Sequence, residues 1–352
     1  MFEQPGLIVL FGSGETSASG RRVFDWLFRR LPSPVQMAIL ETPAGFELNS
    51  AQVAGRVADF LRHRLQNHCP QVTVVPARKR STPFSPDNPE IVAPLLGANA
   101  VFLGPGSPTY AVRQLRDSLA WHTLVARHRL GAAVVLASAG AIASSAYALP
   151  VYEICKVGQD LHWCKGLDFF GAYGLSLAFV SHWNNAEGGA ELDTSRCYMG
   201  QVRFEPLRDM LPPHVAVGGI DEHTALAIDL SAGTCQVLGK GGVTLLRGGD
   251  EQRFESGMTF SINELGRLSM PEPGAGLPPE VWDRAVAAHT EIQRKARQEP
   301  PPEMLALVQE REAARAEQDW ATADALRGRI ATLGWRILDT SQGPQLEPEE
   351  GV

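Results

Sequence analysis

The chain has 352 residues, of which 44% are hydrophobic and 20% are charged, and its formal net charge is -7. This composition is typical of a globular protein with one large domain and an appendage. The negative balance excludes a general electrostatic attraction to nucleic acid or to an anionic membrane surface. We therefore expect a small-molecule or short-peptide substrate as partner, and no membrane.

The cysteines and the N-terminal segment argue against further kinds of structural site and of protein. Five cysteines stand at irregular spacing without a C-x-x-C pair, which argues against a disulfide framework and against a structural zinc site. The chain begins MFEQPGLIVLFGSGE, without the basic and apolar regions of a secretory signal, and it has no run of 18 apolar residues. We therefore expect a cytoplasmic protein whose chemistry requires no metal and no other cofactor.

Apolar runs of strand length alternate with segments of helical spacing in the first part of the chain. The runs are 7–12 (LIVLFG), 35–41 (VQMAILE) and 100–104 (AVFLG), and each precedes an amphipathic stretch. Continuous apolar runs are typical of strands buried on both faces, so this pattern predicts an α/β fold with a mostly parallel sheet in three layers and helices on both faces. Short β-rich pieces between glycine turns, from 214 to 262, predict an antiparallel extension of the same domain.

Proline and glycine mark the later boundaries of the chain. The sequences PEPGAGLPPE at 271–280 and PPPE at 300–303 interrupt regular structure. We predict a main domain over 1–268, a linker with one helix over 269–302, and a small helical module over 303–346.

Sequences rich in glycine and hydroxyl residues follow the predicted strands. They are FGSGET (11–16), LGPGSPT (103–109) and ASAGA (137–141). Loops at the carboxyl ends of parallel strands are where such sheets place their chemistry. Ser138 lies among small residues at a strand-to-helix junction, an arrangement that can present a serine nucleophile and that equally suits a plain tight turn. His182 and the pair Asp221 and Glu222 also fall at the ends of predicted strands, so a serine, a histidine and an acid can meet at one edge.

Taken together with GPGSPTYAVRQL from 104 and GIDEHTAL from 219, these sequences resemble the dipeptidase E and cyanophycinase group of serine peptidases. That group is a branch of the class I glutamine amidotransferase-like fold, and the resemblance covers roughly residues 5–265. It implies that Ser138 is the nucleophile, His182 the general base, and Glu222 the acid that orients the base. Asp221 is then expected to brace the turn.

The resemblance also implies the groups around this triad. The N–H groups of Ala139 and Gly106 are expected to bind the oxyanion, since Pro105 has no N–H to offer. The residues expected to contact the substrate are Gly14, Ser107, Arg196 and Arg203. The two arginines would bind a substrate carboxylate, because the substrates of the family are short peptides with aspartyl groups or β-linked aspartyl-arginine. We expect hydrolysis of an amide or peptide bond in a small substrate.

The sequence departs from the family pattern next to the nucleophile and the histidine. Leu136 stands where the family usually has glycine, two residues before the serine, and a leucine is expected to crowd the turn. Val180, Trp183 and Asn184 replace the usual neighbours of the histidine. These departures favour a second hypothesis, a binding pseudoenzyme of the same fold that has lost efficient hydrolysis.

Residues 311–343 resemble the small C-terminal module of cysteinyl-tRNA synthetases, because A-D-A-L-R, L-G and D-T-x-Q-G recur there at similar spacing. The chain has neither a HIGH-type nor a KMSKS-type signature, so it is not expected to be a synthetase. Residues 280–352 carry 9 Lys and Arg against 14 Asp and Glu, which disfavours strong binding to an RNA backbone without a local patch such as Arg327, Arg329 and Arg336. The hypotheses for this module are docking or homo-oligomerisation, and an accessory role with tRNA.

Overall fold

The structure is a computed structural model that describes residues 4–298, 300–340 and 343–348. The chain divides into two units, Met1–Val286 and Ala287–Val352, and the division falls inside helix α11 (Pro279–Gln298). None of the helices that the structure describes is long and apolar enough to cross a membrane.

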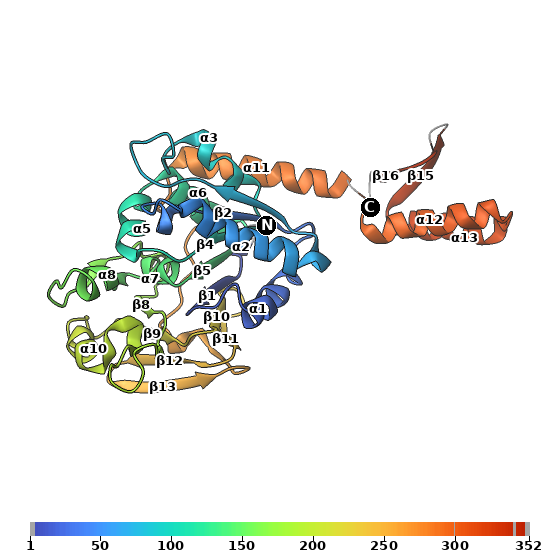
Figure 1. Cartoon of the computed structure of the whole chain (residues 1–352). Coiled ribbons are helices and arrows are strands. Elements are labelled where there is room, and N and C mark those ends of the chain that lie inside the picture. The colour runs from blue at the N-terminus through green and yellow to red at the C-terminus, as the bar shows by residue number, and fades with distance from the viewer. Residues whose placement is uncertain (1–3, 299, 341–342, 349–352) are drawn as a thin grey trace. The chain divides into compact units, whose positions relative to one another are not determined.

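Eight strands form the central sheet of the first unit, in the order β14-β11-β10-β1-β5-β4-β2-β3 (Figure 1). Their bounds are β1 Ile8–Phe11, β2 Gln36–Leu40, β3 Gln71–Val75, β4 Ala100–Leu103, β5 Ala133–Ala137, β10 Thr224–Asp229, β11 Thr234–Gly239 and β14 Thr259–Ser261. The five strands from β1 to β3 in this order pair in parallel, and β10, β11 and β14 extend the sheet antiparallel. The predicted α/β fold with a mostly parallel sheet is confirmed.

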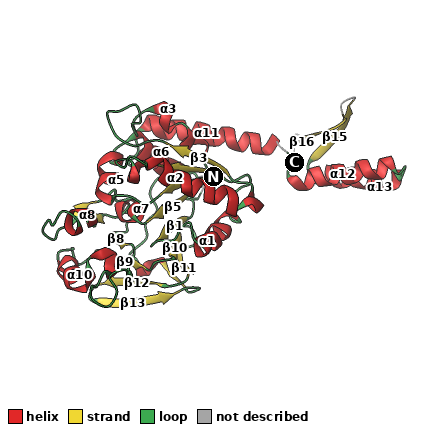
Figure 2. Cartoon of the chain, in the orientation of Figure 1, coloured by secondary structure: helices red, strands yellow, loops and turns green. Residues whose placement is uncertain are grey.

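Helices cover both faces of this sheet (Figure 2). They are α1 Ala18–Phe28, α2 Ser50–Arg64, α3 Pro89–Val92, α4 Pro94–Gly97, α5 Pro108–Leu115, α6 Leu119–Arg129 and α7 Ala139–Ala143. Three further helices, α8 Val151–Cys155, α9 Ser195–Tyr198 and α10 Gly200–Asp209, contribute to another hydrophobic cluster of the same unit. Val9 and Val135 face the hydrophobic cluster that contains residues of α1 and α2, whereas Leu10 and Leu136 face the cluster that contains residues of α4 and α6. Because successive side chains of a strand point to opposite faces, a fully buried strand needs an apolar residue at every position, which is the pattern in the sequence.

A second sheet of four strands packs in the same unit, in the order β13-β12-β9-β8. Its strands are β8 Leu177–Val180, β9 Ala216–Ile220, β12 Gly242–Arg247 and β13 Asp250–Glu255. The short strands β6 Tyr147–Ala148 and β7 Cys164–Lys165 pair with each other as a separate two-stranded sheet. The prediction of one antiparallel extension over 214–262 is therefore incomplete. The strands of that segment divide between the central sheet and this second sheet, and β8 pairs in parallel with β9.

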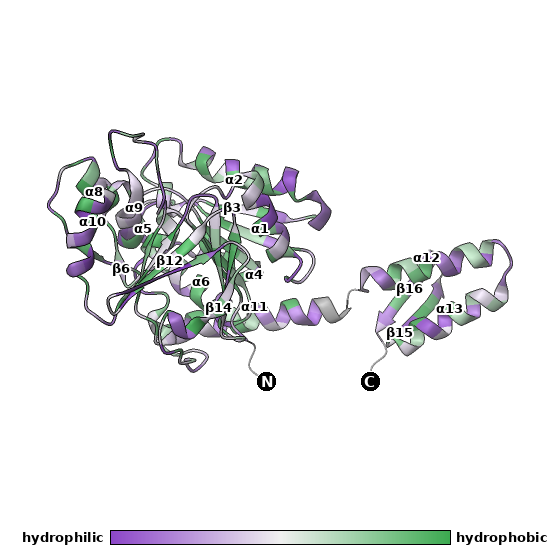
Figure 3. Cartoon of the chain, turned by 90° about the horizontal axis from the view of Figure 1, so that it is seen from below, coloured by the Kyte–Doolittle hydropathy of each residue, from purple (hydrophilic) through white to green (hydrophobic). Residues whose placement is uncertain are grey.

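The second unit contains α12 (Pro302–Ala316), α13 (Trp320–Thr332) and the antiparallel pair β15 (Trp335–Thr340) and β16 (Gly343–Pro348). Both helices carry hydrophobic and hydrophilic residues (Figure 3). Their apolar residues enclose a small core with the hairpin, formed by Met304, Leu307, Ile330, Trp335 and Ile337. The hairpin was not predicted, although Trp335 and Ile337 already show the alternation that is typical of a strand with one buried face.

Gly140 lies in α7 and approaches the end of β4 closely, so its substitution tests how tightly these two elements pack.

 A side chain Cβ on Gly140 would overlap the carbonyl oxygen of Leu103, whereas a Cβ on Gly55, in the middle of α2, would meet nothing within 4 Å. We expect Gly140→Ala to lower the free energy of unfolding by about 1 to 3 kcal/mol, because the backbone must move to relieve the overlap. The control Gly55→Ala should be neutral or stabilising by up to about 1 kcal/mol. Urea denaturation of both variants measures the difference, and equal midpoints would contradict the packing described here.

Candidate active site

Ser138 occupies a sharp turn between β5 and α7. Its φ of 49° and ψ of -110° lie outside the regions that residues other than glycine usually adopt. The turn is fixed at both sides, because the N–H of Ser138 donates to the carbonyl of Phe11 and the N–H of Ile142 donates to the carbonyl of Ser138, each over 3.1 Å. Leu136 does not prevent this turn, since its side chain is buried in the hydrophobic core below it.

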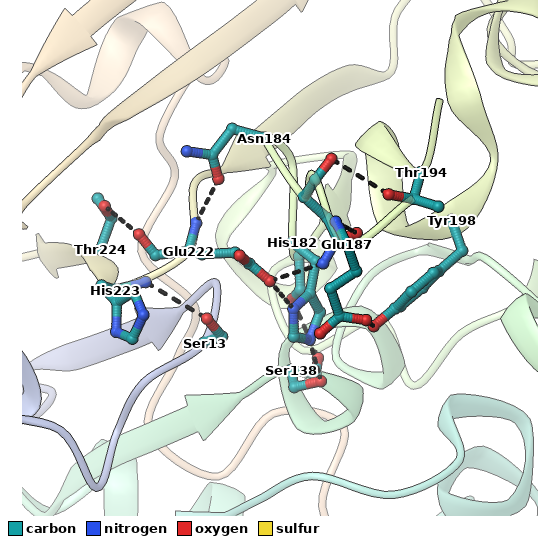
Figure 4. Close-up of polar contacts among 12 residues, drawn as sticks. Ser13, Ser138, His182, Asn184, Glu187, Thr194, Tyr198, Glu222, His223 and Thr224 are labelled. Atoms are coloured by element: carbon teal, nitrogen blue, oxygen red, sulfur yellow. Dashed lines mark hydrogen bonds and ion pairs between the residues drawn. The ribbon is translucent and has the colours of Figure 1, made fainter. Parts of the chain in front are cut away.

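Three side chains from three strand ends form a continuous hydrogen-bonded chain (Figure 4). Ser138 Oγ lies 3.0 Å from His182 Nε2, and His182 Nδ1 lies 3.0 Å from Glu222 Oε1. The side chains of His182 and Glu222 are 20% and 28% exposed, so a solvent-borne substrate can reach them while most of their surface is covered. This is the spatial order of nucleophile, base and orienting acid.

The carboxylate of Glu222 has partners other than the imidazole. The amide of Asn185 donates to Glu222 Oε1 over 2.9 Å, and the N–H of Glu222 donates to Asn184 Oδ1 over 2.8 Å. Burial acts to raise the pKa of Glu222, but the hydrogen bonds from His182 and Asn185 outweigh it and the net pKa lies below the ordinary value. Glu222 is thus held as a carboxylate, which can accept a hydrogen bond from a protonated Nδ1 of His182.

Asp221, next to this acid, braces the turn from the opposite side. Its side chain is 1% exposed, and its Oδ2 accepts from the N–H of Gly242 over 2.9 Å and from Arg253 over 2.7 Å. These bonds tie the turn to β12 and β13. Glu222 is thereby left as the residue of the pair that faces His182.

The loop after β4 lies against the turn that carries Ser138. The N–H of Gly140 donates to the carbonyl of Gly104 over 3.1 Å. Within the part of the chain that the structure describes, the N–H groups of Ala139 and Gly106 have no hydrogen-bond acceptor, so they are free to bind a substrate oxygen. Ser107 has a structural task, because its Oγ accepts from the N–H of Tyr110 at the start of α5. The oxyanion role of Ala139 and Gly106 stays a prediction.

The loop after β1 holds His182 and His223 in place. The carbonyl of Gly12 accepts from the N–H of His182 over 3.3 Å, and Ser13 Oγ accepts from the N–H of His223 over 3.3 Å. Gly14 has a φ of 74°, and a Cβ there would overlap the ring of His223. Gly14 is therefore required by the close approach of two loops, and its contact with substrate stays a prediction.

Glu15, which follows in the same loop, was not predicted as a site residue. Burial raises the pKa of its carboxyl group, while the nearby imidazoles of His182 and His223 act in the opposite direction. The sequence held one signal for it, because Glu15 is the acid of the FGSGET sequence that follows the first strand.

The two arginines expected to bind a substrate carboxylate lie elsewhere. The guanidinium of Arg196 stacks over the ring of Trp183 at 4.9 Å and donates to Ser195 Oγ. Arg203 donates to the carbonyl groups of Met199 and Tyr198. Among the described residues, neither guanidinium contacts a member of the triad, so the geometry gives the predicted carboxylate-binding role no support.

Two further side chains beside the histidine were not predicted. The ring of Tyr198 lies 6.3 Å from the ring of His182, measured between centroids, and its hydroxyl donates to Glu187 Oε2 over 2.8 Å. No composition or spacing signal marks either residue, because the loop after β8 and helix α9 become neighbours only in the fold.

No group of three or more His, Cys, Asp or Glu residues that could hold a metal ion occurs in the described ranges.

The first unit is similar in structure to a solved peptidase from an acI-B1 Actinobacterium. The TM-score is 0.58 at 21% sequence identity, and the match covers 73% of this chain and 97% of that chain. At 21% identity this likeness shows a shared fold and nothing finer. It confirms the architecture that the sequence resemblance implies for the N-terminal part of the chain.

The C-terminal module matches known proteins by sequence. Residues 297–345 match the model of the cysteinyl-tRNA ligase anticodon binding domain. The cysteine–tRNA ligase of Methanosarcina acetivorans is 48% identical over 54 residues, which are 15% of this chain and 11% of the ligase. That of Chlamydia felis is 46% identical over 56 residues, which are 16% of this chain and 12% of the ligase. The chain thus spans about a tenth of the length of these relatives, and the predicted resemblance of the module is confirmed.

The raised pKa of Glu15 predicts a stability cost at neutral pH. The folded protein holds the Glu15 proton more tightly than the unfolded chain does, so ionisation of this carboxyl above its folded pKa destabilises the folded state. We expect Glu15→Gln to raise the melting temperature at pH 7. The gain should shrink as the pH falls from the folded pKa towards about 4.3, and it should vanish below that pH, because the carboxyl group is then protonated in the folded and in the unfolded state. Thermal melts of wild type and variant from pH 4 to pH 8 test this, and a gain independent of pH would contradict it.

Proposed function

We propose that this protein is a serine-type hydrolase that cleaves an amide or peptide bond in a small substrate. The observation that carries the proposal is the continuous hydrogen-bonded chain from Ser138 Oγ through His182 to Glu222. A serine hydroxyl is a weak nucleophile unless a base takes its proton, and His182 Nε2 is within reach to do so. Glu222 holds the imidazole in the tautomer that leaves Nε2 free to accept.

The reaction follows from this arrangement. Ser138 Oγ attacks the substrate carbonyl carbon while its proton passes to His182 Nε2, and the N–H groups of Ala139 and Gly106 bind the oxyanion that forms. The C–N bond then breaks as His182 donates the proton to the leaving amine, which leaves an acyl-enzyme on Ser138. Water, deprotonated by His182, attacks the acyl carbon, and the bond from that carbon to Ser138 Oγ breaks as His182 returns the proton to Oγ and the acid is released. The peptidase fold of the first unit supports this assignment.

Substitution of the nucleophile tests the proposal. We expect Ser138→Ala to lower kcat at least about a thousandfold on any amide that the wild type cleaves, because the covalent route is lost. Ser256→Ala serves as a matched control, since this hydroxyl donates to the carbonyl of Gly239 on the exposed edge of the fold. Turnover of a panel of small dipeptides, including α- and β-aspartyl dipeptides, measures both. Equal turnover by wild type and Ser138→Ala would contradict the nucleophile. Binding without turnover in both would favour the pseudoenzyme.

A second candidate function, association with tRNA, concerns the C-terminal module. Its match to an anticodon binding domain is the observation that favours it. Three of its arginines are ion-paired, Arg311 and Arg315 with Asp339 and Arg336 with Glu347. Arg327 and Arg329 are exposed on α13 and are therefore the side chains that we propose to contact phosphate.

The salt dependence of tRNA binding to the full chain tests this candidate function. We expect labelled tRNA to bind with an affinity that falls as the salt concentration rises. The double variant Arg327→Glu with Arg329→Glu should bind more weakly, and its slope of log affinity against log salt concentration should be shallower by the equivalent of about two phosphate contacts. Arg21→Glu with Arg22→Glu, two exposed arginines of α1, is the control of equal charge change. Fluorescence anisotropy at several salt concentrations gives the slopes. Binding lost equally in both double variants, or self-association without tRNA binding, would contradict this candidate.

A further inference from the structure

The acid of the proposed triad lies on the short turn that joins the two sheets of the first unit. Strand β9 of the second sheet ends at Ile220 and β10 of the central sheet begins at Thr224, so residues 221–223 form the whole connection. The backbone of Glu222 is bound on both sides, because its N–H donates to Asn184 Oδ1 over 2.8 Å and its carbonyl accepts from Thr224 Oγ1 over 3.1 Å (Figure 4). The place of the Glu222 carboxylate therefore depends on how this turn is held.

Asp221 anchors the turn to the second sheet through a buried carboxylate. Its Oδ2 accepts from Arg253 Nη2 over 2.7 Å and from the N–H of Gly242 over 2.9 Å, and its own N–H donates to the carbonyl of Gly242 over 3.2 Å. Its Oδ1 is buried and has no hydrogen-bond partner among the described residues. A carboxylate that is 1% exposed needs a positive partner to stay charged, and Arg253 supplies it.

The guanidinium of Arg253 is aimed at Asp221 by its other bonds. Its Nε donates to Glu255 Oε1 over 2.7 Å, and its Nη1 donates to Thr244 Oγ1 over 3.3 Å. Thr244 is the residue of β12 that pairs with Arg253 of β13. A Cβ on Gly242 would lie 2.9 Å from Arg253 Cζ, so the lack of a side chain there admits the guanidinium. Arg253 is thus a residue of the outer strand, with a side chain 41% exposed, whose charged end reaches a buried acid.

Removal of the guanidinium would leave the N–H of Gly242 as the described donor to the Asp221 carboxylate. A buried charge without a counter-ion is costly, so the turn opens towards water or the carboxyl group takes up a proton. Both changes weaken the bond to Gly242, because a hydrogen bond to an ionised acceptor in a closed site is the stronger one. Glu222 is the next residue, and its Oε1 must stay near the present 3.0 Å from His182 Nδ1 to orient the imidazole.

We propose that Arg253 is a positioning residue of the triad, which acts through its ion pair with Asp221 to hold Glu222 within hydrogen-bond reach of His182. The inference rests on the proposed function, because Glu222 has a catalytic task only where His182 acts as the base. In the described contacts, Arg253 touches none of the three triad side chains, so its effect passes through the 221–223 turn.

The rate at which a fluorophosphonate labels Ser138 in the full chain measures this effect. We expect Arg253→Met to slow labelling about ten- to a hundredfold, because a small displacement of the orienting acid misplaces the base. Arg253→Lys should recover part of the rate, since it keeps the charge but not the fork of donors. Arg247→Met is the control of equal charge change in the same sheet. It should label at the wild-type rate, because the Arg247 guanidinium donates to the carbonyls of Asn263 and Glu264.

A second substitution separates positioning from a general loss of structure. Glu222→Ala labels slowly by itself, because the orienting carboxylate is missing. In that background we expect Arg253→Met to slow labelling by less than about twofold, since there is no longer an acid to position. A purely structural role of Arg253 gives the same factor in both backgrounds, and this result would overturn the inference.

The pair variant Asp221→Asn with Arg253→Met covers the case in which the single substitution prevents folding. It removes both charges, so that no buried carboxylate is left without its partner. We expect it to be folded by circular dichroism and to label as slowly as a positioning loss requires. Labelling of this folded variant at the wild-type rate would overturn the inference and leave the hydrolase standing. Absence of labelling at Ser138 in the wild type would overturn the proposed function and, with it, the inference.

Discussion

The site depends on a backbone constraint at the ends of three strands, where residues other than glycine adopt positive φ. Ser138 after β5, His182 after β8 and His223 after β9 have φ values of 49°, 52° and 58°. Such conformations cost about 1 to 3 kcal/mol each and persist only where the surrounding structure fixes them. Here the fixing comes from the sheets, whose parallel register brings the strand ends together, and from the glycine-rich loop after β1, whose carbonyl at Gly12 accepts from His182.

The electrostatic character of the site is set by the charged side chains that lie near His182. Acidic side chains approach the imidazole of His182 from separate elements: Glu15 from the loop after β1, Glu222 from the turn after β9, and Glu187 through its bond to Tyr198. The arginines of the α9 and α10 region stabilise the backbone and an indole ring. The surroundings of His182 are therefore rich in acidic groups.

The sequence predicted much of the fold because buried parallel strands are continuous apolar runs, as at 7–12, 35–41 and 100–104. It failed where pairing is decided by distant partners. No local sequence feature assigns β10 to the central sheet and β12 to the second sheet. The hairpin of β15 and β16 was missed because the module was predicted to be helical.

The candidate site divides in the same way. Ser138, His182 and Glu222 were predicted from the resemblance and from their places at strand ends, and the fold brings their side chains into hydrogen-bond contact. Tyr198 and Glu187 were missed, because their proximity to His182 arises from a left-handed turn that local propensities do not predict. Arg196 and Arg203 were predicted from the resemblance, and in the structure Arg196 packs over Trp183 while Arg203 bonds to backbone carbonyls.

The central claim is that Ser138 is an activated nucleophile, and covalent labelling tests it most directly. The full chain is incubated with a fluorophosphonate, and tandem mass spectrometry locates the adduct. The account predicts one adduct on Ser138 in the wild type, unchanged in Ser256→Ala and strongly slowed in His182→Ala, because the base is then missing. An adduct on another residue, no adduct, or equal labelling of Ser138 without His182 would contradict it.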